Sequence, residues 1–244
     1  MRKIAGAIGV VSVFAVIIFS VRGNEEAKLR EVLASAIKAH GGAEKMEKLK
    51  ASIIKTKGKL VDLEYTAETS IQLPDRSRTV AESKLGKFIQ ILDNDKGWIK
   101  VGDFTRECLK EELAEMKEQL NAACIARLSV LSGEEYTLSP LGEENIDGRP
   151  AIGMRVERKG FREVSLYFDK ENNLLLKIQT RVRDPLRGGL ECTSETLYSD
   201  YRDVDGLMMA YKFTIKYDGK VYNEGELTDV QFAEKLDDSL FEKP

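Results

Sequence analysis

Side chains suited to acid–base or nucleophilic chemistry are few in this chain of 244 residues. The only histidine, His40, precedes Gly41-Gly42 at the expected end of a helix, where the helix dipole favours a histidine. No Gly-x-Ser-x-Gly elbow accompanies it, so neither a Ser-His-Asp nor a Cys-His arrangement has support. The sequence therefore predicts no catalytic residue and a protein that is not an enzyme, and a hydrolase built on His40 is the weakest alternative.

Metal and cofactor sites have no better support. The chain contains no Cys-x-x-Cys or His-x-x-x-His spacing, no calcium-loop spacing and no glycine-rich phosphate loop. The acidic run Asp93-Asn94-Asp95 fits a hairpin turn better than a weak calcium site. Glu64 and Glu68 alternate with apolar residues, as carboxylates do on the solvated face of a strand. We expect no metal and no cofactor.

The cysteines Cys108, Cys124 and Cys192 are too few for a disulfide framework, and one must stay unpaired. Cys108 and Cys124 fall on one predicted helix, about four turns apart, which is too far for a bond between them. A disulfide bond between Cys192 and either of the other two cysteines remains an alternative. Three buried thiols are the favoured interpretation.

The N-terminus carries a targeting signal. Arg2 and Lys3 precede an uncharged apolar run over residues 4–21, which Arg22 ends. Residues 1–23 are therefore predicted to be a cleaved signal peptide or a retained membrane anchor, with membrane contact through residues 4–21 if they are retained. Both alternatives place residues 24–244, expected to form a single domain, in the periplasm or cell envelope. The formal net charge of −3 argues against a nucleic-acid partner.

The elements that must position any site are mostly strands. Apolar and polar residues alternate over much of 51–101 and 136–231, and turn signals such as Asp218-Gly219 separate the runs. This pattern predicts about 10–11 strands, joined by short turns without βαβ alternation. Helices are expected over residues 25–39, 43–48 and 107–131. The predicted fold class is α+β, mainly antiparallel β.

The helix expected over residues 107–131 has one continuous apolar stripe, formed by Leu109, Leu113, Met116, Leu120, Cys124, Leu128 and Leu131. One interpretation is a lid over an apolar cavity. The other is a helix packed on a sheet, and the stripe does not separate the two. Near the C-terminus, a helical turn is expected to place Phe241 as a plug at the base of the sheet.

The order of elements resembles a known family. The features that carry the resemblance, besides the exported N-terminus and the mid-chain helix, are His40–Met46, Lys57-Gly58, Gly97-Trp98, Tyr198–Gly206, Asp218-Gly219 and Asp237–Phe241. Together they resemble the outer-membrane lipoprotein-sorting superfamily, which includes the periplasmic carriers LolA and LolB, over nearly all of residues 25–244. The resemblance implies an open, strongly curved antiparallel sheet, an unclosed β-barrel, with helices covering its concave face.

The resemblance also implies a function. It predicts a non-enzymatic envelope protein that binds or carries lipid or lipoprotein acyl chains between sheet and helices, with a membrane-protein partner. The alternative is a membrane-anchored sensor or regulatory interaction module on the same fold. Four arginines are candidates for gating the cavity, and the sequence distinguishes none of them: Arg76, Arg78, Arg155 and Arg162.

The predicted cavity residues are apolar side chains expected to face inward. Plain core packing explains each of them at least as well as ligand contact, because any core uses such residues. They are Leu63, Tyr65, Trp98, Leu113, Met116, Leu120, Leu166, Phe168, Leu176, Phe213 and Ile215.

Overall fold

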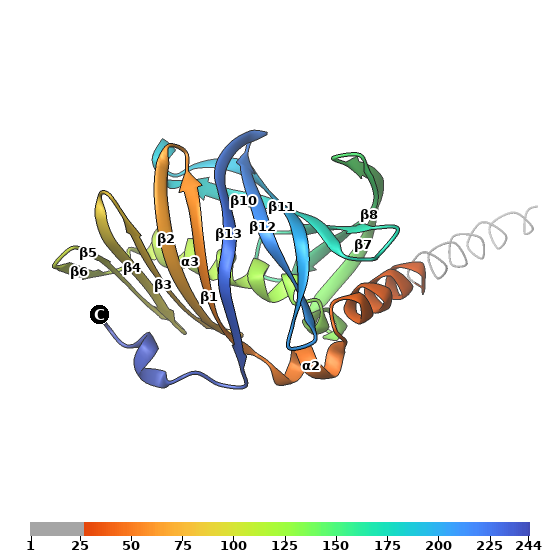
Figure 1. Cartoon of the computed structure of the whole chain (residues 1–244), viewed down its shortest axis with the longest axis horizontal. Helices are drawn as coiled ribbons and strands as arrows, with labels where there is room; N and C mark the ends of the chain where they lie inside the picture. Colours follow the sequence, from red (N-terminus) through yellow and green to blue (C-terminus); the bar gives the residue numbers. More distant parts are fainter. Residues whose placement is uncertain (1–26) are drawn as a thin grey trace, which may run out of the picture.

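The computed structural model describes residues 27–244. These residues form one 13-stranded antiparallel sheet in the order β6-β5-β4-β3-β2-β1-β13-β12-β11-β10-β9-β8-β7. Figure 1 shows the sheet strongly curved and unclosed, with helices on its concave side. The predicted open α+β architecture is confirmed, with more strands than the predicted 10–11.

The strands are β1 (Ala51–Leu60), β2 (Leu63–Gln72), β3 (Arg76–Ser83), β4 (Gly86–Asp93), β5 (Lys96–Val101), β6 (Phe104–Glu107), β7 (Tyr136–Ile146), β8 (Arg149–Arg158), β9 (Val164–Asp169), β10 (Leu175–Asp184), β11 (Leu190–Val204), β12 (Leu207–Tyr217) and β13 (Lys220–Ala233). The helices are an N-terminal helix described over residues 27–39, α2 (Ala43–Lys48) and α3 (Lys110–Ala126). Short 3-10 turns are η1 (Ser129–Ser132), η2 (Pro185–Arg187) and η3 (Asp238–Phe241).

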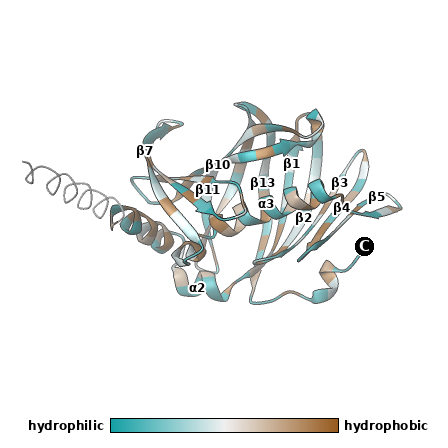
Figure 2. Ribbon diagram, turned by 180° about the vertical axis from the view of Figure 1, so that it is seen from behind, coloured by the Kyte–Doolittle hydropathy of each residue, from teal (hydrophilic) through white to brown (hydrophobic). Residues whose placement is uncertain are grey.

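Two meanders make up the sheet, and the pairing of β1 with β13 joins them at its centre. The two edge strands, β6 and β7, are consecutive in the chain, and α3 is the connection between them. Because the chain must travel from one edge to the other, α3 crosses the open side of the curved sheet. Figure 2 shows this helix lying across the strands.

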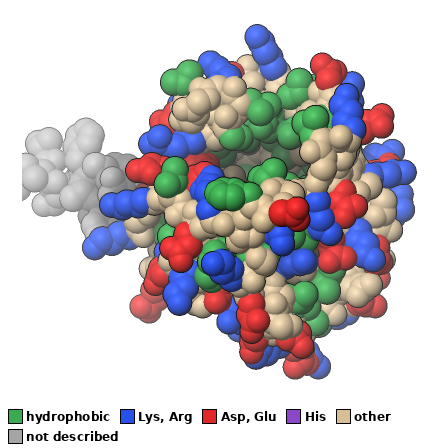
Figure 3. Space-filling view, turned by 90° about the vertical axis from the view of Figure 1, so that its left-hand side faces the viewer, with side chains coloured by type: hydrophobic (Ala, Val, Ile, Leu, Met, Phe, Trp, Pro, Cys, Tyr) green, Lys and Arg blue, Asp and Glu red, His purple; other side chains and the backbone are tan. Residues whose placement is uncertain are grey.

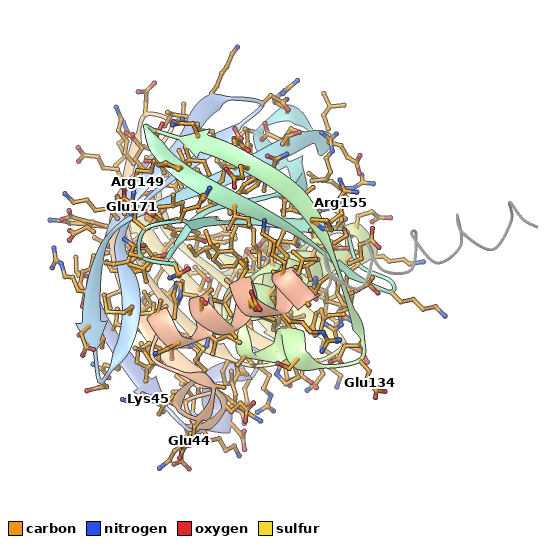
Figure 4. The ribbon with its side chains drawn as sticks, turned by 90° about the vertical axis from the view of Figure 1, so that its right-hand side faces the viewer. Glu44, Lys45, Glu134, Arg149, Arg155 and Glu171 are labelled. Carbon is orange, nitrogen blue, oxygen red and sulfur yellow. The ribbon has the colours of Figure 1, made fainter. Side chains whose placement is uncertain are left out.

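Apolar packing is divided between the two ends of α3. At its start, Leu92, Met116 and Leu120 form a buried cluster with Cys124 and the partly buried Leu113. Beyond its end lies a larger core made by β8, β9 and β10, the N-terminal helix and the segment that follows α3. Figure 4 shows the N-terminal helix on this side of the molecule, above Glu44 and Lys45 of α2. The middle of α3 lies between these two cores.

A pair of glycines marks the centre of the sheet. Gly58 of β1 and Gly225 of β13 are register partners. On the flanking strands, Tyr65 of β2 is the register partner of Gly58, and Phe213 of β12 is that of Gly225. Each ring covers its glycine. A methyl group at Gly225 would lie 2.6 Å from Cζ of Phe213, and one at Gly58 would lie 2.9 Å from the hydroxyl of Tyr65. Close approach of aromatic rings to the backbone therefore requires glycine at both positions.

Several boundaries differ from the sequence predictions. The helix expected over 107–131 is shorter, because residues 104–107 form β6 and η1 follows α3. Cys108 consequently precedes the helix instead of lying on it. Cys108, Cys124 and Cys192 are all free thiols, and the last two are buried.

The C-terminal turn also lies elsewhere than predicted. Phe241 packs with Ile89, Ile91 and Trp98 on the outer face of the sheet, so it does not plug the base of the concave side. The predictions for residues 1–23 lie outside the described residues. Among residues 27–244, no helix has the length and apolarity needed to cross a membrane.

Candidate ligand cavity

A cavity of about 550 Å³ separates the middle of α3 from the centre of the sheet. Strands β10, β11, β12 and β13 form most of its wall, and Leu60 at the end of β1 completes it. A smaller space of about 140 Å³ lies against β2, β3 and β4. Gln90, Gln119 and Ala123 line both spaces, so the two adjoin beneath α3. Figure 3 shows the molecule hollowed on this side, with hydrophobic side chains around the hollow.

The helix presents small side chains to the larger space. Ala122, Ala123 and Ala126 line it, together with Glu115 and Gln119 nearer the start of the helix. The residues follow one another at helical steps of three and four, so they share one face of α3. Alanine fills little of the gap, and the space beneath the helix therefore stays open.

The large apolar stripe of the helix has another role. Leu113, Met116 and Leu120 pack with Leu92 at one end of α3, and Leu128 and Leu131, beyond the helix, join the core at the other end. Both interpretations of this segment are therefore partly correct. The stripe packs on the rest of the protein, as in an ordinary core helix, while its Met116 and Leu120 also line the smaller space and the alanines cover the larger one.

The sheet wall is apolar with hydroxyl groups between. Ile178, Val182 and Ile215 supply aliphatic surface. The polar side chains from the strands that line the cavity are Gln90, Thr180, Arg181, Ser194, Thr196 and Asn223. The wall can therefore bury a hydrocarbon chain and still offer hydrogen-bond partners to a more polar group.

Three tyrosines complete this wall. Tyr217 and Tyr222 stack with ring centroids 3.9 Å apart and planes 15° from parallel. Burial raises the pKa of Tyr198 and of Tyr222 to about 12, and it raises the pKa of Tyr217 as well. All three phenols are therefore neutral at physiological pH and present hydroxyl groups, not phenolates.

One arginine ties the helix to the sheet beside the cavity. The guanidinium Nη1 of Arg162 donates to Oε2 of Glu115 at 2.8 Å and to the carbonyl oxygen of Arg181 at 3.1 Å. The backbone N–H of Arg162 donates to the carboxylate of Glu118 at 3.1 Å. Loop 159–163 between β8 and β9 is thus fastened to the middle of α3.

The other three candidate arginines do not contact α3. Arg76 pairs with Asp93 and Asp238 and lies over Phe241 on the outer face. Arg78 pairs with Glu68 at 3.8 Å, and Arg155 pairs with Glu163 at 3.7 Å.

Nine of the eleven predicted cavity residues fall into three groups. Met116, Leu120 and Ile215 line the two spaces. Leu63, Tyr65 and Phe213 share the inner face with Leu60 and Ile215 by strand register, and the Tyr65 hydroxyl donates to Asn223 at 3.0 Å. Leu113, Leu166 and Phe168 lie in the inner cores.

Trp98 and Leu176 do not line the cavity, because both lie on the outer face of the sheet. Trp98 contributes to the cluster around Phe241, and Leu176 packs with Tyr167 and Ala151. On β5 the inward positions belong to Gly97 and Ile99, which leaves Trp98 on the other side. A register shift between Leu175 and Lys177 changes the alternation on β10 and turns Leu176 outward.

The sequence analysis missed the alanine face of α3 and two of the three tyrosines in the wall. The third, Tyr217, was predicted as candidate cavity wall from its alternation with Phe213 and Ile215. Tyr198 and Tyr222 lie in strands whose alternation is interrupted, by Asp200 at φ 55° and by the register shift at Ile215/Lys216. The three alanines could have been found from their own helical spacing.

His40 has a structural setting. Its Nδ1 donates to the carbonyl oxygen of Ala36 at 2.8 Å, and its Nε2 accepts from the backbone N–H of Leu175 at 3.4 Å. The ring also packs edge-on against Tyr201. Burial lowers the pKa of His40. The neutral imidazole joins the N-terminal helix to β10 and uses both of its nitrogens to do so.

Comparisons with known proteins find relatives in structure alone. No protein-family model and no curated protein sequence matches this chain. An outer membrane lipoprotein-sorting protein domain from Vibrio parahaemolyticus is similar in fold, with TM-score 0.52, 12% identity and coverage of 87% of this chain and 95% of that one.

Two further structures are similar. A LolA superfamily protein from Nitrosomonas europaea has TM-score 0.54 and 14% identity, with coverage of 82% and 96%. A DUF1329 family protein from Desulfovibrio piger has TM-score 0.53 and 13% identity, with coverage of 87% and 96%. The predicted resemblance to the outer-membrane lipoprotein-sorting superfamily is therefore confirmed at the level of the fold.

Proposed function

We propose that this chain is a non-enzymatic envelope protein that binds lipid or lipoprotein acyl chains in the cavity between α3 and the sheet. The observation that carries the proposal is the space of about 550 Å³ beneath the alanine face of α3. Its volume falls within the range of roughly 300–1,000 Å³ typical of small-molecule sites. The similar fold of the lipoprotein-sorting domain and of the LolA superfamily protein supports the same ligand class.

The chemistry of the lining suits an amphipathic ligand. A hydrocarbon chain would lie between Ala122 and Ala123 on one side and Ile178 and Ile215 on the other. Each methylene withdrawn from water there contributes about 0.8 kcal/mol. A polar group at the end of the chain would meet the hydroxyl groups of the wall. Release then requires a competing apolar surface, on a membrane or a membrane-protein partner, and no chemical step.

Lipid analysis tests the proposal directly. The full chain is purified without detergent, extracted with organic solvent, and the extract is examined by mass spectrometry. Ala123→Phe fills the space where the two cavities adjoin and should abolish most of the lipid signal. Ala114→Phe is the matched control, because Ala114 lies on the exposed side of the same helix.

The outcomes separate clearly. Lipid in the wild type and in Ala114→Phe, with little in Ala123→Phe, supports an acyl-chain site in this cavity. A wild-type protein that yields no lipid and binds no hydrophobic dye contradicts the proposal. Equal lipid in all three proteins would place the ligand elsewhere on the molecule.

A further inference from the structure

Exposed apolar side chains gather at one end of the sheet. Of the eight large hydrophobic residues that are strongly exposed among residues 27–244, seven lie in or beside hairpin turns. Leu85, Phe104 and Leu186 are the most exposed of the seven, at 78%, 69% and 64%. The complete set, here called the apolar rim, is Val61, Leu85, Val101, Phe104, Leu186, Leu190 and Val221.

Strand register places these turns at the same end. In an antiparallel meander alternate turns share an end, so the β1–β2, β3–β4 and β5–β6 turns lie together. Leu60 pairs with Asn223, which brings the β12–β13 turn beside the β1–β2 turn. Ser194 pairs with Tyr217, which adds the β10–β11 turn. Figure 1 shows the β1–β2 and β12–β13 turns along the upper edge of the molecule, with the β3–β4 turn to their left.

The opposite end of the sheet has a different composition. Its turns include Asp93–Asp95, Asn145–Gly148, Lys170–Asn173 and Asp205-Gly206. Within the described part of the chain, none of these turns carries a strongly exposed large hydrophobic residue. Strongly exposed apolar side chains are therefore found at the turns of one end of the sheet, and the turns of the other end lack them.

In the part of the chain that the structure describes, the unpaired charges beside the apolar rim are mostly basic: three lysines stand against one carboxylate, that of Asp103 next to Phe104. Among the ion pairs of residues 27–244, Lys84, Lys100 and Lys220 have no acidic partner. Each lies within one residue of a member of the apolar rim. Unpaired lysines next to exposed apolar side chains favour an anionic surface that also offers a hydrocarbon phase.

We infer that the apolar rim is the surface through which this protein contacts an anionic lipid bilayer. The seven side chains project from five separate turns with lysines between them, and they form no continuous patch of the kind at the centre of a protein interface. A bilayer accepts separate protrusions, because lipid chains rearrange around each one. Part of the rim lies beside the cavity, because Leu60, Pro185 and Tyr222 line the cavity and directly adjoin Val61, Leu186 and Val221.

Depth-dependent quenching tests the inference in the full chain. Phe104→Trp places a fluorophore on the rim, and vesicles of phosphatidylcholine mixed with phosphatidylglycerol carry bromine on their acyl chains. Bromine quenches tryptophan only at short range, so membrane attachment through residues 4–21 alone does not produce the signal. The background is low because the sole native tryptophan, Trp98, is only 9% exposed and lies under Phe241.

Two variants serve as controls. Leu109→Trp reports from the eighth exposed apolar position, which is 62% exposed and lies beyond the far end of β6. Glu171→Trp reports from a turn at the opposite end of the sheet. The quenching measurement is repeated on the double variant Phe104→Trp/Ala123→Phe, whose cavity is filled. This separates bilayer contact from quenching by a lipid held in the cavity, so the inference is tested independently of the proposed function.

We expect a blue shift and loss of most tryptophan emission for Phe104→Trp, with little change in either control, and a smaller loss on vesicles of phosphatidylcholine alone. The result should persist with Ala123→Phe. Quenching of Phe104→Trp no greater than in Leu109→Trp and Glu171→Trp overturns the inference. Quenching that disappears with Ala123→Phe also overturns it, because the signal then comes from lipid in the cavity.

Discussion

Arg162 reaches across from the β8–β9 loop to Glu115 in the middle of α3, with 2.8 Å between Nη1 and Oε2. Both side chains are largely buried, at 21% and 13% exposure. Hydrogen bonds to charged groups typically contribute about 1.5–3 kcal/mol each. This contact fastens the helix that covers the cavity beside Leu113 and Met116 of its first apolar cluster.

Arg162→Ala should therefore loosen the middle of α3. The amide hydrogens of residues 115–126 are expected to exchange faster with deuterium, and a hydrophobic dye should enter the cavity faster. Arg155→Ala is the control, because Arg155 forms a more exposed pair with Glu163 on the outer face. Unchanged exchange in α3 for Arg162→Ala would show that the apolar clusters alone hold the helix in place.

Gly225→Ala should destabilise the fold by about 1–3 kcal/mol, because the added methyl group meets the ring of Phe213. The nearest atom belongs to the far end of a side chain, so Phe213→Leu in the same protein should recover much of the loss. Urea unfolding of the two single variants and the double variant measures this coupling.

Gly58→Ala provides the contrast. Its methyl group would lie 2.5 Å from the backbone carbonyl oxygen of Glu224, which no side-chain substitution can move. Tyr65→Leu is therefore expected to leave most of the loss in place. Recovery at Gly58 equal to that at Gly225 would contradict this account of the central glycines.

Phe241→Ala should cost about 3–5 kcal/mol of stability, since a buried aromatic ring leaves the outer-face cluster with Trp98. The cavity is on the other side of the sheet, so bound lipid per folded molecule should not change. Phe104→Ala, at an exposed position, is the control and should alter stability by less than about 0.5 kcal/mol. Loss of lipid from folded Phe241→Ala would mean that the C-terminal turn does contribute to the cavity.

Acidification should weaken the fold through His40. Burial lowers its pKa in the folded protein below the ordinary value of 6.5, so the unfolded chain binds the proton more readily. Stability due to the neutral imidazole is present above pH 6.5 and is lost as the pH falls from there through the folded-state pKa. The slope approaches about 1.4 kcal/mol per pH unit within that window.

His40→Gln keeps a donor and an acceptor without a titrating ring. Urea unfolding between neutral and mildly acidic pH should give a shallower pH dependence for this variant than for the wild type. Equal slopes would assign the acid sensitivity to other groups.

The fold class could be predicted from the alternation of apolar and polar residues, whereas the positions of some turns could not. The β1–β2 connection is Val61-Asp62, and Val61 adopts φ 54° although a β-branched residue rarely does. Because no glycine or asparagine marks that turn, the alternation of apolar and polar residues runs through Val61 and Asp62 into β2 without a visible break. The short strand β6 was not predicted, and its last residue, Glu107, was assigned to the following helix because it continues a helical pattern.

The candidate site was harder to predict, because a strand pattern shows alternation but not which face is concave. Trp98 is the largest residue of β5, yet Cys108 and Leu113 approach Gly97 so closely that the inner side has no room for an indole there. For α3, large apolar residues suggested the functional face. The cavity instead lies opposite small residues, since a ligand space requires that side chains be absent from it.

The paired glycines at the centre of the sheet lie where its two meanders join. Register shifts lie close by, at Lys55/Thr56 and at Ile215/Lys216, so the strands on either side of β13 are joined irregularly. Each half of the sheet has its own apolar core, and α3 contributes to both: Met116 and Leu120 to one, Ile125 to the other. The helix therefore braces the two halves of the sheet against each other, so that a change in the angle between them has to displace α3 from one of its two cores.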